Sequence, residues 1–421
     1  MTSNFRNQDG LLARVNFPLY CVQMLTSRHV LVAGGGGPSK TGIANGFEIF
    51  EINHNGKHFI AEEVIRHETG PNVVMNCAAY SNDHHTYLVS GQESHCQLYM
   101  VESVIQDSKI KDENSSKNNV KHRRVHEENH SNSLPKEVTE KSRRLTFKIR
   151  PSDSIQTDFS KNEPLQKVVR ISSSGSFMAT AGLDGHVRIW TFPQLMKLVD
   201  IAAHSKEVDD IDFNQNETEI VSLSRDGTAV IWNIKTGKKI QDLKWPTPEN
   251  AKYVYKRCRY GVVEEDKSKN RLFILTNPVS QPSKLNAYLQ LWDAQERALK
   301  RVASFNENVA SLAVRDDGRF VAVGTMFSGS VEIFIAFSLQ RVLCVRGAHN
   351  MFITGLEFLP VTSEKHSVTS TAEAAVISIS VDNRVCIHTL HYRHSIPSWI
   401  AVVLIVLTLF LTFVFCSYVG L

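Results

Sequence analysis

Thirteen residues near the start of the chain, 34–46, combine six glycines with a lysine and a threonine, which are residue types that can hold a phosphate group. A phosphate-binding loop ends in Gly-Lys-Ser/Thr and is followed at once by a helix whose first amides contact the phosphate. Here Ser39 precedes Lys40, and Gly42 and Gly46 follow before a strand-like run. Because no helix can begin there, we do not expect this chain to bind a nucleotide itself.

Both flanks of this stretch have the pattern of short strands. Residues 29–33 are mostly apolar, and residues 47–52 alternate apolar with acidic side chains. Paired strands are usually joined by 2–5 residues, and glycine is costly to order because it loses the most backbone freedom. A long glycine-dense connection therefore favours a functional surface, with a tolerated flexible loop as the alternative.

The overall composition points to a chain without strong preference for polyanions. It has 421 residues, 47 of them basic and 43 acidic, for a net charge of +4, so a nucleic-acid partner is not expected. Its seven cysteines are an odd number and include no Cys-x-x-Cys pair. This pattern argues against a disulfide framework or a zinc site and favours a reducing compartment.

The C-terminal segment 399–419 has 21 residues without a charge, enough to span the roughly 30 Å hydrocarbon layer of a bilayer as a helix. Trp399 and Tyr418 stand at its ends, where aromatic side chains favour the membrane interface. The N-terminus has no apolar run of the secretory type. The sequence therefore predicts a single C-terminal transmembrane helix, with the preceding chain in the cytosol and the C-terminus in the lumen. The modest length of the span mildly favours a thin membrane such as the endoplasmic reticulum.

Two segments in the middle of the chain align without gaps. Residues 177–190 and 219–232 are offset by 42, and each reads as a strand, an Asp-Gly turn and a strand ending in tryptophan. This period and this pattern are typical of WD-repeat propeller blades. We expect Asp184 and Asp226 to stabilise these turns, and His204 to join the second of them.

The same period continues more weakly toward both ends of the chain. Seven positions are candidates for the strand-ending residue: Phe50, Tyr99, Trp190, Trp232, Trp292, Phe334 and His388. They predict an all-β fold, a closed seven-bladed propeller over residues 11–394. Residues 13–17 would form the outer strand of the last blade beside residues 384–390, which removes open sheet edges. Separate β domains are the alternative, and no linker between blades supports them.

One segment interrupts the repeat, at about residues 105–165. It is rich in charged and small polar residues and contains two basic clusters, 121–124 and 141–144. We expect a disordered insertion, because so polar a segment cannot bury enough surface to fold alone. Nuclear import or an anionic-lipid patch is the alternative use of the basic clusters.

The combination of seven WD-type blades, one C-terminal span and a glycine-rich loop in the first blade resembles the prolactin regulatory element-binding protein family. Its members are endoplasmic-reticulum guanine nucleotide exchange factors for the small GTPase that starts COPII coat assembly. The resemblance covers nearly the whole chain. Its most specific part is the four glycines from Gly34 to Gly37 followed by Gly42, Ile43 and Asn45. The charged insertion after the second blade departs from the family pattern.

The resemblance implies a site and a cofactor. In the family the loop is held by a potassium ion and contacts the GTPase, and the exchange factor performs no covalent chemistry. Carried over to this chain, it implies that Ile43, Asn45 and Gly42 act on the GTPase. The rest of the loop follows: Lys40, Thr41 and Ala44 would complete the partner-binding loop, and the backbone carbonyls of Gly34, Gly35, Gly36 and Gly37 would hold potassium.

Two other functions remain open from the sequence. A passive propeller scaffold would tether coat or cargo proteins at the membrane and bind without releasing nucleotide. A DNA-binding regulator would show a steeply salt-dependent affinity. A hydrolase has the least support, because the sequence offers no Ser/His/Asp or Cys/His set.

Overall fold

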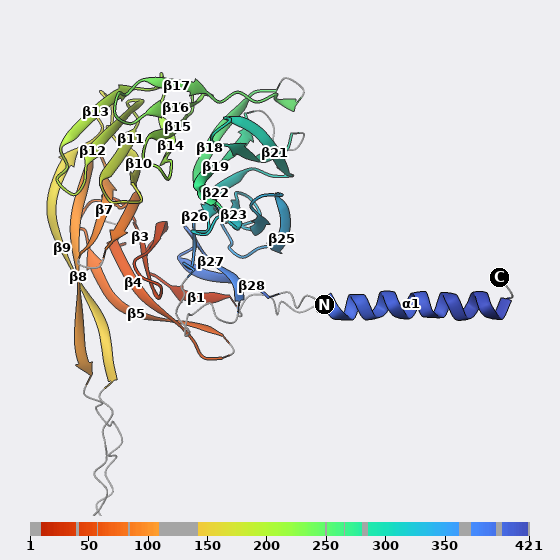
Figure 1. The fold of residues 1–421 in the computed structure, drawn as a ribbon. Helices are drawn as coiled ribbons and strands as arrows, with labels where there is room; N and C mark the ends of the chain where they lie inside the picture. Colours follow the sequence, from red (N-terminus) through yellow and green to blue (C-terminus); the bar gives the residue numbers. More distant parts are fainter. Residues whose placement is uncertain are drawn as a thin grey trace, which may run out of the picture.

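The computed structural model describes residues 10–38, 42–56, 58–82, 85–108, 142–248, 251–264, 266–279, 285–361, 372–392 and 398–419. These residues form seven antiparallel sheets of four strands, arranged as blades around a common centre, followed by one helix (Figure 1). The predicted all-β, seven-bladed propeller is confirmed.

The blades follow one another along the chain, and each runs from its innermost to its outermost strand. Blade 1 holds β2 (Leu19–Met24), β3 (His29–Gly35), β4 (Asn45–His54) and β5 (Phe59–Glu68). Blade 2 holds β6 (Asn76–Ser81), β7 (Thr86–Gln92), β8 (His95–Ser108) and β9 (Ser142–Gln156). Blade 3 holds β10 (Gln166–Ile171), β11 (Phe177–Gly182), β12 (His186–Thr191) and β13 (Lys197–Ala202). Blade 4 holds β14 (Val208–Phe213), β15 (Glu219–Ser224), β16 (Ala229–Asn233) and β17 (Lys239–Asp242).

The last three blades repeat this order. Blade 5 holds β18 (Tyr253–Val263), β19 (Asp266–Pro278), β20 (Ala287–Asp293) and β21 (Ala298–Phe305). Blade 6 holds β22 (Val309–Val314), β23 (Phe320–Thr325), β24 (Val331–Ile335) and β25 (Gln340–Val345). Blade 7 holds β26 (Ile353–Phe358), β27 (Ala372–Ser380) and β28 (Arg384–His391), and its outer strand is β1 (Leu11–Arg14) from the N-terminal end.

The innermost strands of neighbouring blades contact one another in a ring. It follows from the up-and-down order within each blade that all connections between second and third strands emerge on one face. The connections between successive blades emerge on the same face. We call it the hairpin face, because the β3–β4 hairpin lies there, and we call the other the opposite face.

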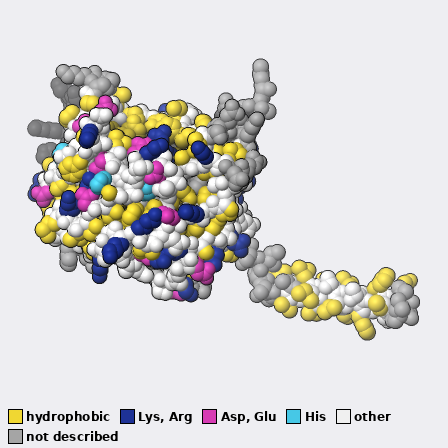
Figure 2. All heavy atoms as spheres, turned by 90° about the horizontal axis from the view of Figure 1, so that it is seen from above, with side chains coloured by type: hydrophobic (Ala, Val, Ile, Leu, Met, Phe, Trp, Pro, Cys, Tyr) yellow, Lys and Arg dark blue, Asp and Glu magenta, His cyan; other side chains and the backbone are white. Residues whose placement is uncertain are grey.

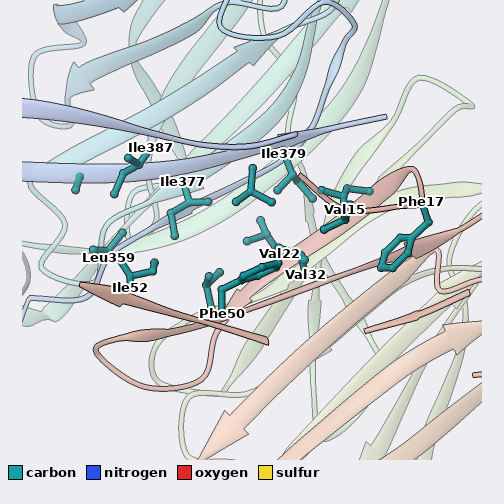
Figure 3. Packing of buried hydrophobic residues seen from close by; sticks show 14 residues of the cluster. Val15, Phe17, Val22, Val32, Phe50, Ile52, Leu359, Ile377, Ile379 and Ile387 are labelled. Atoms are coloured by element: carbon teal, nitrogen blue, oxygen red, sulfur yellow. The ribbon is translucent and has the colours of Figure 1, made fainter. Parts of the chain in front are cut away.

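The ring is closed by strands from the two ends of the propeller. Leu11 pairs with Cys386 and Arg14 with Arg384, so β1 completes the blade that β26 to β28 begin. Val15 and Phe17, just after β1, lie in one apolar cluster with side chains of blades 1 and 7 (Figure 3). The predicted closure is confirmed, although the paired strand spans residues 11–14 rather than 13–17.

All seven predicted strand-ending residues lie in the third strand of their blades. The network in blade 4 shows why the pattern recurs: Trp232 Nε1 donates to Ser222 Oγ at 2.8 Å, and His204 Nε2 lies 2.7 Å from the same hydroxyl. His204 Nδ1 lies 3.2 Å from Asp226 Oδ2. The turn-stabilising role predicted for Asp226 and His204 is confirmed.

Blade 7 builds the same network with a histidine in place of tryptophan. His349 Nε2 and His388 Nε2 each lie 2.8 Å from Ser378 Oγ, and His349 Nδ1 lies 3.0 Å from Asp382. His388 is 7% exposed. Its burial, with His349 nearby, lowers the pKa of His388 to about 3.

This depressed pKa makes stability depend on pH. In the unfolded chain His388 titrates near 6.5. The stability that the neutral, buried ring gives the fold is therefore fully present above that pH, and it is lost as the pH falls from 6.5 toward 3. We predict that replacing His388 with Phe, the residue type of blades 1 and 6, makes the loss of unfolding free energy between pH 7 and pH 5 smaller by about 2 kcal/mol. Denaturant unfolding of both proteins at the two pH values measures this, and equal losses would contradict it.

The expected disordered insertion is wrong at both of its boundaries. β8 continues to Ser108, and β9 occupies residues 142–156 as the outer strand of blade 2, with Ser108 paired to Ser142. The extended pairing satisfies the backbone groups of a polar segment that has little apolar surface to bury. Residues 109–141, with the basic cluster 121–124, lie outside the described residues, and the backbone of 142–144 belongs to β9.

The chain leaves the propeller at the end of β28, on the opposite face. The 22-residue helix α1 (Ser398–Val419) follows (Figure 1). Among the described residues, no helix reaches the combined length and hydropathy of a membrane span. All seven cysteines are free thiols.

Candidate functional site: the glycine hairpin

The glycine-rich stretch forms the end of blade 1. β3 and β4 extend farther than expected, with Gly34 paired to Gly46 and Gly35 to Asn45. The connection between the strands is therefore residues 36–44, and the predicted thirteen-residue loop is shorter by its first two and last two members. We call residues 34–46 the glycine hairpin.

Three of the glycines are needed because other backbone lies against them. A Cβ on Gly34 would lie 1.9 Å from the Pro18 carbonyl oxygen, and one on Gly46 would lie 2.2 Å from the His67 oxygen. Gly35 has a φ of +145°, and its Cβ would lie 2.1 Å from Asn45 Oδ1. The hairpin base is thus held closely between the β1–β2 connection and the end of strand β5.

The Asn45 side chain fastens the hairpin from within. Its Oδ1 accepts a hydrogen bond from the Gly37 amide at 2.9 Å, and its Nδ2 donates to the carbonyls of Gly37 at 3.2 Å and Gly70 at 2.9 Å. The Thr69 amide donates to the Asn45 carbonyl at 3.0 Å. With 5% of its surface exposed, Asn45 positions the hairpin in this structure, and the action on a GTPase that the resemblance implies for it stays a prediction.

The hairpin tip is open to solvent. Ile43 is 40% exposed, and Gly42 is exposed while Ala44 is half-buried. Gly37 and Gly42 have φ values of +84° and +79°, a region that glycine enters without strain, and open space surrounds both. Lys40 and Thr41 lie outside the described residues. The structure therefore offers Ile43 as the apolar side chain that a partner can reach.

An ion pair between a buried carboxylate and a partly exposed guanidinium supports the strand below the tip. Glu48 Oε1 lies 2.7 Å from Arg66 Nη2, and Glu48 is almost fully buried. Burial raises the pKa of Glu48, and Arg66 partly offsets that rise. Next to it Phe47 packs edge-on against Tyr99, which ties blade 1 to blade 2.

Two backbone oxygens converge at the hairpin base. The Gly37 and Gly70 carbonyls both point at one nitrogen, Asn45 Nδ2, so this corner already binds a positively polarised group. The described residues contain no group of three or more His, Cys, Asp or Glu side chains placed to hold a metal ion.

The central cavity gives no support for covalent catalysis. It measures about 310 Å³ and lies among the innermost strands. Asp210 bridges Arg170 at 3.2 Å and Arg259 at 2.7 Å; burial alone would raise its pKa, and the two guanidinium groups reverse this and lower it. Burial raises the pKa of Cys21 far above its ordinary value, so the thiol stays protonated. No histidine is among the described residues that line the cavity.

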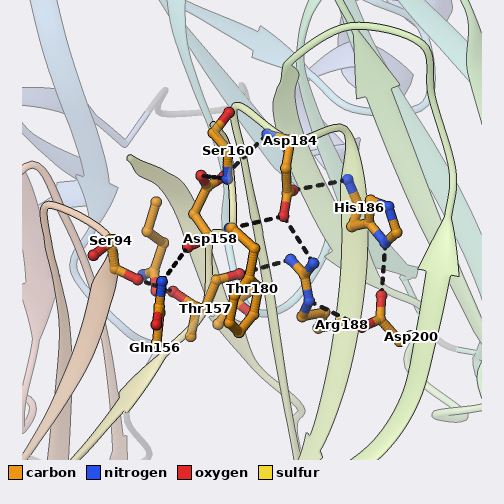
Figure 4. Close-up of polar contacts among 12 residues, drawn as sticks. Ser94, Gln156, Thr157, Asp158, Ser160, Thr180, Asp184, His186, Arg188 and Asp200 are labelled. Atoms are coloured by element: carbon orange, nitrogen blue, oxygen red, sulfur yellow. Dashed lines mark hydrogen bonds and ion pairs between the residues drawn. The ribbon is translucent and has the colours of Figure 1, made fainter. Parts of the chain in front are cut away.

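A second charged cluster, in blade 3, is structural (Figure 4). Arg188 is 3% exposed and lies 2.7 Å from Asp184 and 3.1 Å from Asp200, and its Nη1 donates to the Thr157 carbonyl at 2.7 Å. Asp184 in turn accepts from the His186 amide at 3.0 Å, as its predicted turn role requires. The sequence around Arg188 does not indicate that its side chain is buried. Its partners come from the β9–β10 connection, the β11–β12 turn and strand β13.

Comparison with known proteins identifies the repeats and the relatives of the whole chain. Residues 164–191 and 196–233 match the family model of the WD domain, G-beta repeat. The chain is 32% identical over 410 residues to the guanine nucleotide-exchange factor SEC12 of Mus musculus, covering 95% of both chains. The protein of the same name from Rattus norvegicus matches to the same extent. SEC12-like protein 1 of Arabidopsis thaliana is 28% identical over 214 residues, half of each chain.

The hydrogen bond from Asn45 to Gly70 predicts a measurable effect on hairpin order. Gly70 has a φ of +74°, so Gly70→Ala strains the connection and displaces the carbonyl that Asn45 contacts. We expect the Gly37 amide to exchange with solvent deuterium about five to ten times faster, corresponding to roughly 1 kcal/mol.

A matched control lies at the other end of β4. Gly56 has a φ of +89° and, like Gly70, open space around its Cβ position, so Gly56→Ala carries a similar backbone strain at a distance from the hairpin. It should leave Gly37 exchange unchanged. Equal acceleration by both substitutions would show that general destabilisation, rather than the Asn45 contact, controls hairpin order.

Proposed function

The chain belongs to the SEC12 family of guanine nucleotide-exchange factors, and from this we propose that its glycine hairpin is the element that expels GDP from a small GTPase. The partner we propose is the GTPase that starts COPII vesicle formation. The observation that carries the proposal is the exposed Ile43 on a hairpin whose base is fastened by Asn45. A partner then meets an apolar contact on an ordered support.

The mechanism requires binding energy and no covalent step. If the chain binds the nucleotide-free GTPase more tightly than the GDP-bound form, GDP must bind the complex more weakly by the same factor. A rigid tip that occupies part of the space or contacts of the nucleotide-bound state supplies that difference. GTP then fills the vacated site. In this scheme Ile43 and Gly42 contact the GTPase, Ala44, Lys40 and Thr41 complete the contact, and Asn45 holds the pose.

We also propose that a potassium ion stiffens the hairpin through the backbone carbonyls of Gly34, Gly35, Gly36 and Gly37. What supports this is the donor chemistry: hard oxygen ligands suit a hard cation, and the Gly37 carbonyl already lies at a corner that attracts a polarised N–H group. When bound, the ion would lower the ordering cost of the connection.

For the membrane, we propose that α1 anchors the chain in the endoplasmic reticulum with the propeller on the cytosolic side. Its 22 residues reach about 33 Å as a helix, and residues 399–419 carry no charge. Figure 2 shows hydrophobic and uncharged side chains along α1, in contrast to the mixed charges of the propeller surface. Exposed apolar residues cover it on all sides, including Val402, Phe410, Phe413 and Phe415.

The anchoring proposal predicts the behaviour of a truncated chain. The full chain should float with liposomes in a density gradient and resist extraction at high pH. A chain that ends at residue 397 should stay in the soluble fraction. Flotation of the truncated chain to the same extent would place the membrane contact on the propeller instead.

The exchange proposal predicts that one substitution in the hairpin slows GDP release from the GTPase. The full chain in detergent micelles should accelerate release of a fluorescent GDP analogue from the COPII GTPase. Ile43→Ala should lower the maximal rate at least tenfold, because it removes the apolar contact while leaving the fold intact. Ile60→Ala is the control, since Ile60 is as exposed as Ile43 and lies at the outer strand of the same blade.

The outcomes separate the competing functions. Near-normal release with Ile43→Ala would reject the site, and GTPase binding without accelerated release would favour a passive scaffold. Release measured in potassium and in sodium buffers tests the ion, since equal rates in both would reject a potassium requirement.

A further inference from the structure

The hairpin face carries a second group of exposed apolar side chains, in one connection within blade 6 and in the connection from blade 6 to blade 7. Phe327, between β23 and β24, is 63% exposed, and Met351 and Phe352, between β25 and β26, are also exposed. We call these three residues the aromatic patch. Phe327 lies in a connection between second and third strands, and Met351 and Phe352 lie in a connection between successive blades. Both kinds of connection emerge on the hairpin face, so the patch is on the same face as the glycine hairpin.

The Phe327 turn is held rigidly although its side chain contacts solvent. The amides of Phe327 and Ser328 donate to Glu307 Oε2 at 3.0 and 2.8 Å, and Ser328 Oγ also contacts Glu307. Thr325 Oγ1 lies 2.9 Å from Ser328 Oγ. A carboxylate is thus used to fix the backbone on either side of an exposed phenyl ring. Because the backbone of this turn is fixed in advance, it loses little entropy when a partner covers the ring.

The two connections of the patch are locked to each other. A Cβ on Gly329 would lie 2.1 Å from the His349 carbonyl, and the His349 amide donates to the Gly329 carbonyl at 3.0 Å. Phe327 and Met351 therefore belong to one rigid unit rather than to two independent loops.

Hydrogen bonds connect this unit to the base of the glycine hairpin across blade 7. Ser380 Oγ donates to the Phe352 carbonyl at 2.8 Å, and the Asn383 carbonyl accepts from the Val15 amide at 3.0 Å. Residues 15–18 then reach blade 1, where the Pro18 carbonyl accepts from the Gly35 amide at 3.1 Å. The blade 7 turn and the β1–β2 connection thus form a continuous strip between the patch and the hairpin.

We propose that the aromatic patch is a second contact for the same small GTPase, which binds across this strip while the glycine hairpin acts on its nucleotide site. The inference rests on the proposed function. It commits to the GTPase because the strip is continuous with the hairpin and because the chain leaves for α1 from the opposite face, which keeps the hairpin face free for a soluble partner. The patch supplies affinity and orientation, and Ile43 supplies the nucleotide release.

This division of roles predicts which kinetic constant each substitution changes. In full chain assayed in micelles, Phe327→Ser should raise the GTPase concentration for half-maximal release about tenfold, and should leave the maximal rate within twofold. Ile43→Ala should instead lower the maximal rate. Phe337→Ser is the matched control, because Phe337 is 55% exposed in the same blade but follows β24 on the opposite face, and it should change neither constant.

Each outcome decides the inference. If Phe327→Ser behaves like Phe337→Ser while Ile43→Ala abolishes release, the patch is not a GTPase contact and the hairpin assignment stands. If none of the three affects release, the proposed function of the hairpin fails as well. If Phe327→Ser instead dissociates a dimer in sedimentation experiments at unchanged half-maximal concentration, a second copy of the chain covers the patch and the inference is overturned.

Discussion

The geometry of the glycine hairpin depends on the side-chain amide of Asn45. One oxygen and one nitrogen of the buried Asn45 side chain satisfy the Gly37 amide and the Gly37 and Gly70 carbonyls at the edge of blade 1. The Asn45 amide, which is 5% exposed, would be costly to leave without these partners. The amide therefore joins the turn of the hairpin to the connection that leads into blade 2. The described base of the hairpin is thereby attached to the chain segments on both sides of blade 1.

The ring is rigid because its ends are joined by strand pairing and by apolar packing together. β1 hydrogen-bonds to β28, and Val15 and Phe17 enter the cluster that also holds Val22 and Val32 of blade 1 (Figure 3). The segment that closes the ring continues directly into Pro18, whose carbonyl contacts the hairpin base. Closure of the fold and placement of the site thus use the same few residues. Loosening of the N-terminal strand would be transmitted to the hairpin.

Sequence patterns predicted the parts of this structure that repeat, and missed those that depend on distant contacts. The tryptophan and Asp-Gly spacing located the blades, because each blade needs the same hydrogen bonds among Ser222, His204 and Trp232 or their equivalents. The polar end of β8 and the strand β9 escaped prediction, since their apolar core residues, such as Phe147 and Ile149, are few and stand among charged ones, and pairing with a distant strand defines them. The glycines and Ile43 were identified by the family resemblance, but the inward role of Asn45 was not. Its partner Gly70 lies 25 residues away, a separation that no local pattern encodes.

The entropy of ordering explains why the base of a short hairpin in an exchange factor would be held by so many close backbone contacts. Fixing the nine residues of the connection 36–44 from a disordered state would cost on the order of 10 kcal/mol, at about 1 kcal/mol or more per residue. That is more than the whole binding free energy of a micromolar complex, about 8 kcal/mol. For an unsupported loop of this composition, the free energy of ordering would cancel the free energy gained from contacts with the partner. None would then remain to weaken nucleotide binding. The close approaches at Gly34, Gly35 and Gly46 fix both ends of that connection when the propeller folds, and the bonds between Asn45 and Gly37 fix one residue within it. The ordering cost left for binding is then smaller, and contacts made by Ile43 can distinguish one state of the partner from another.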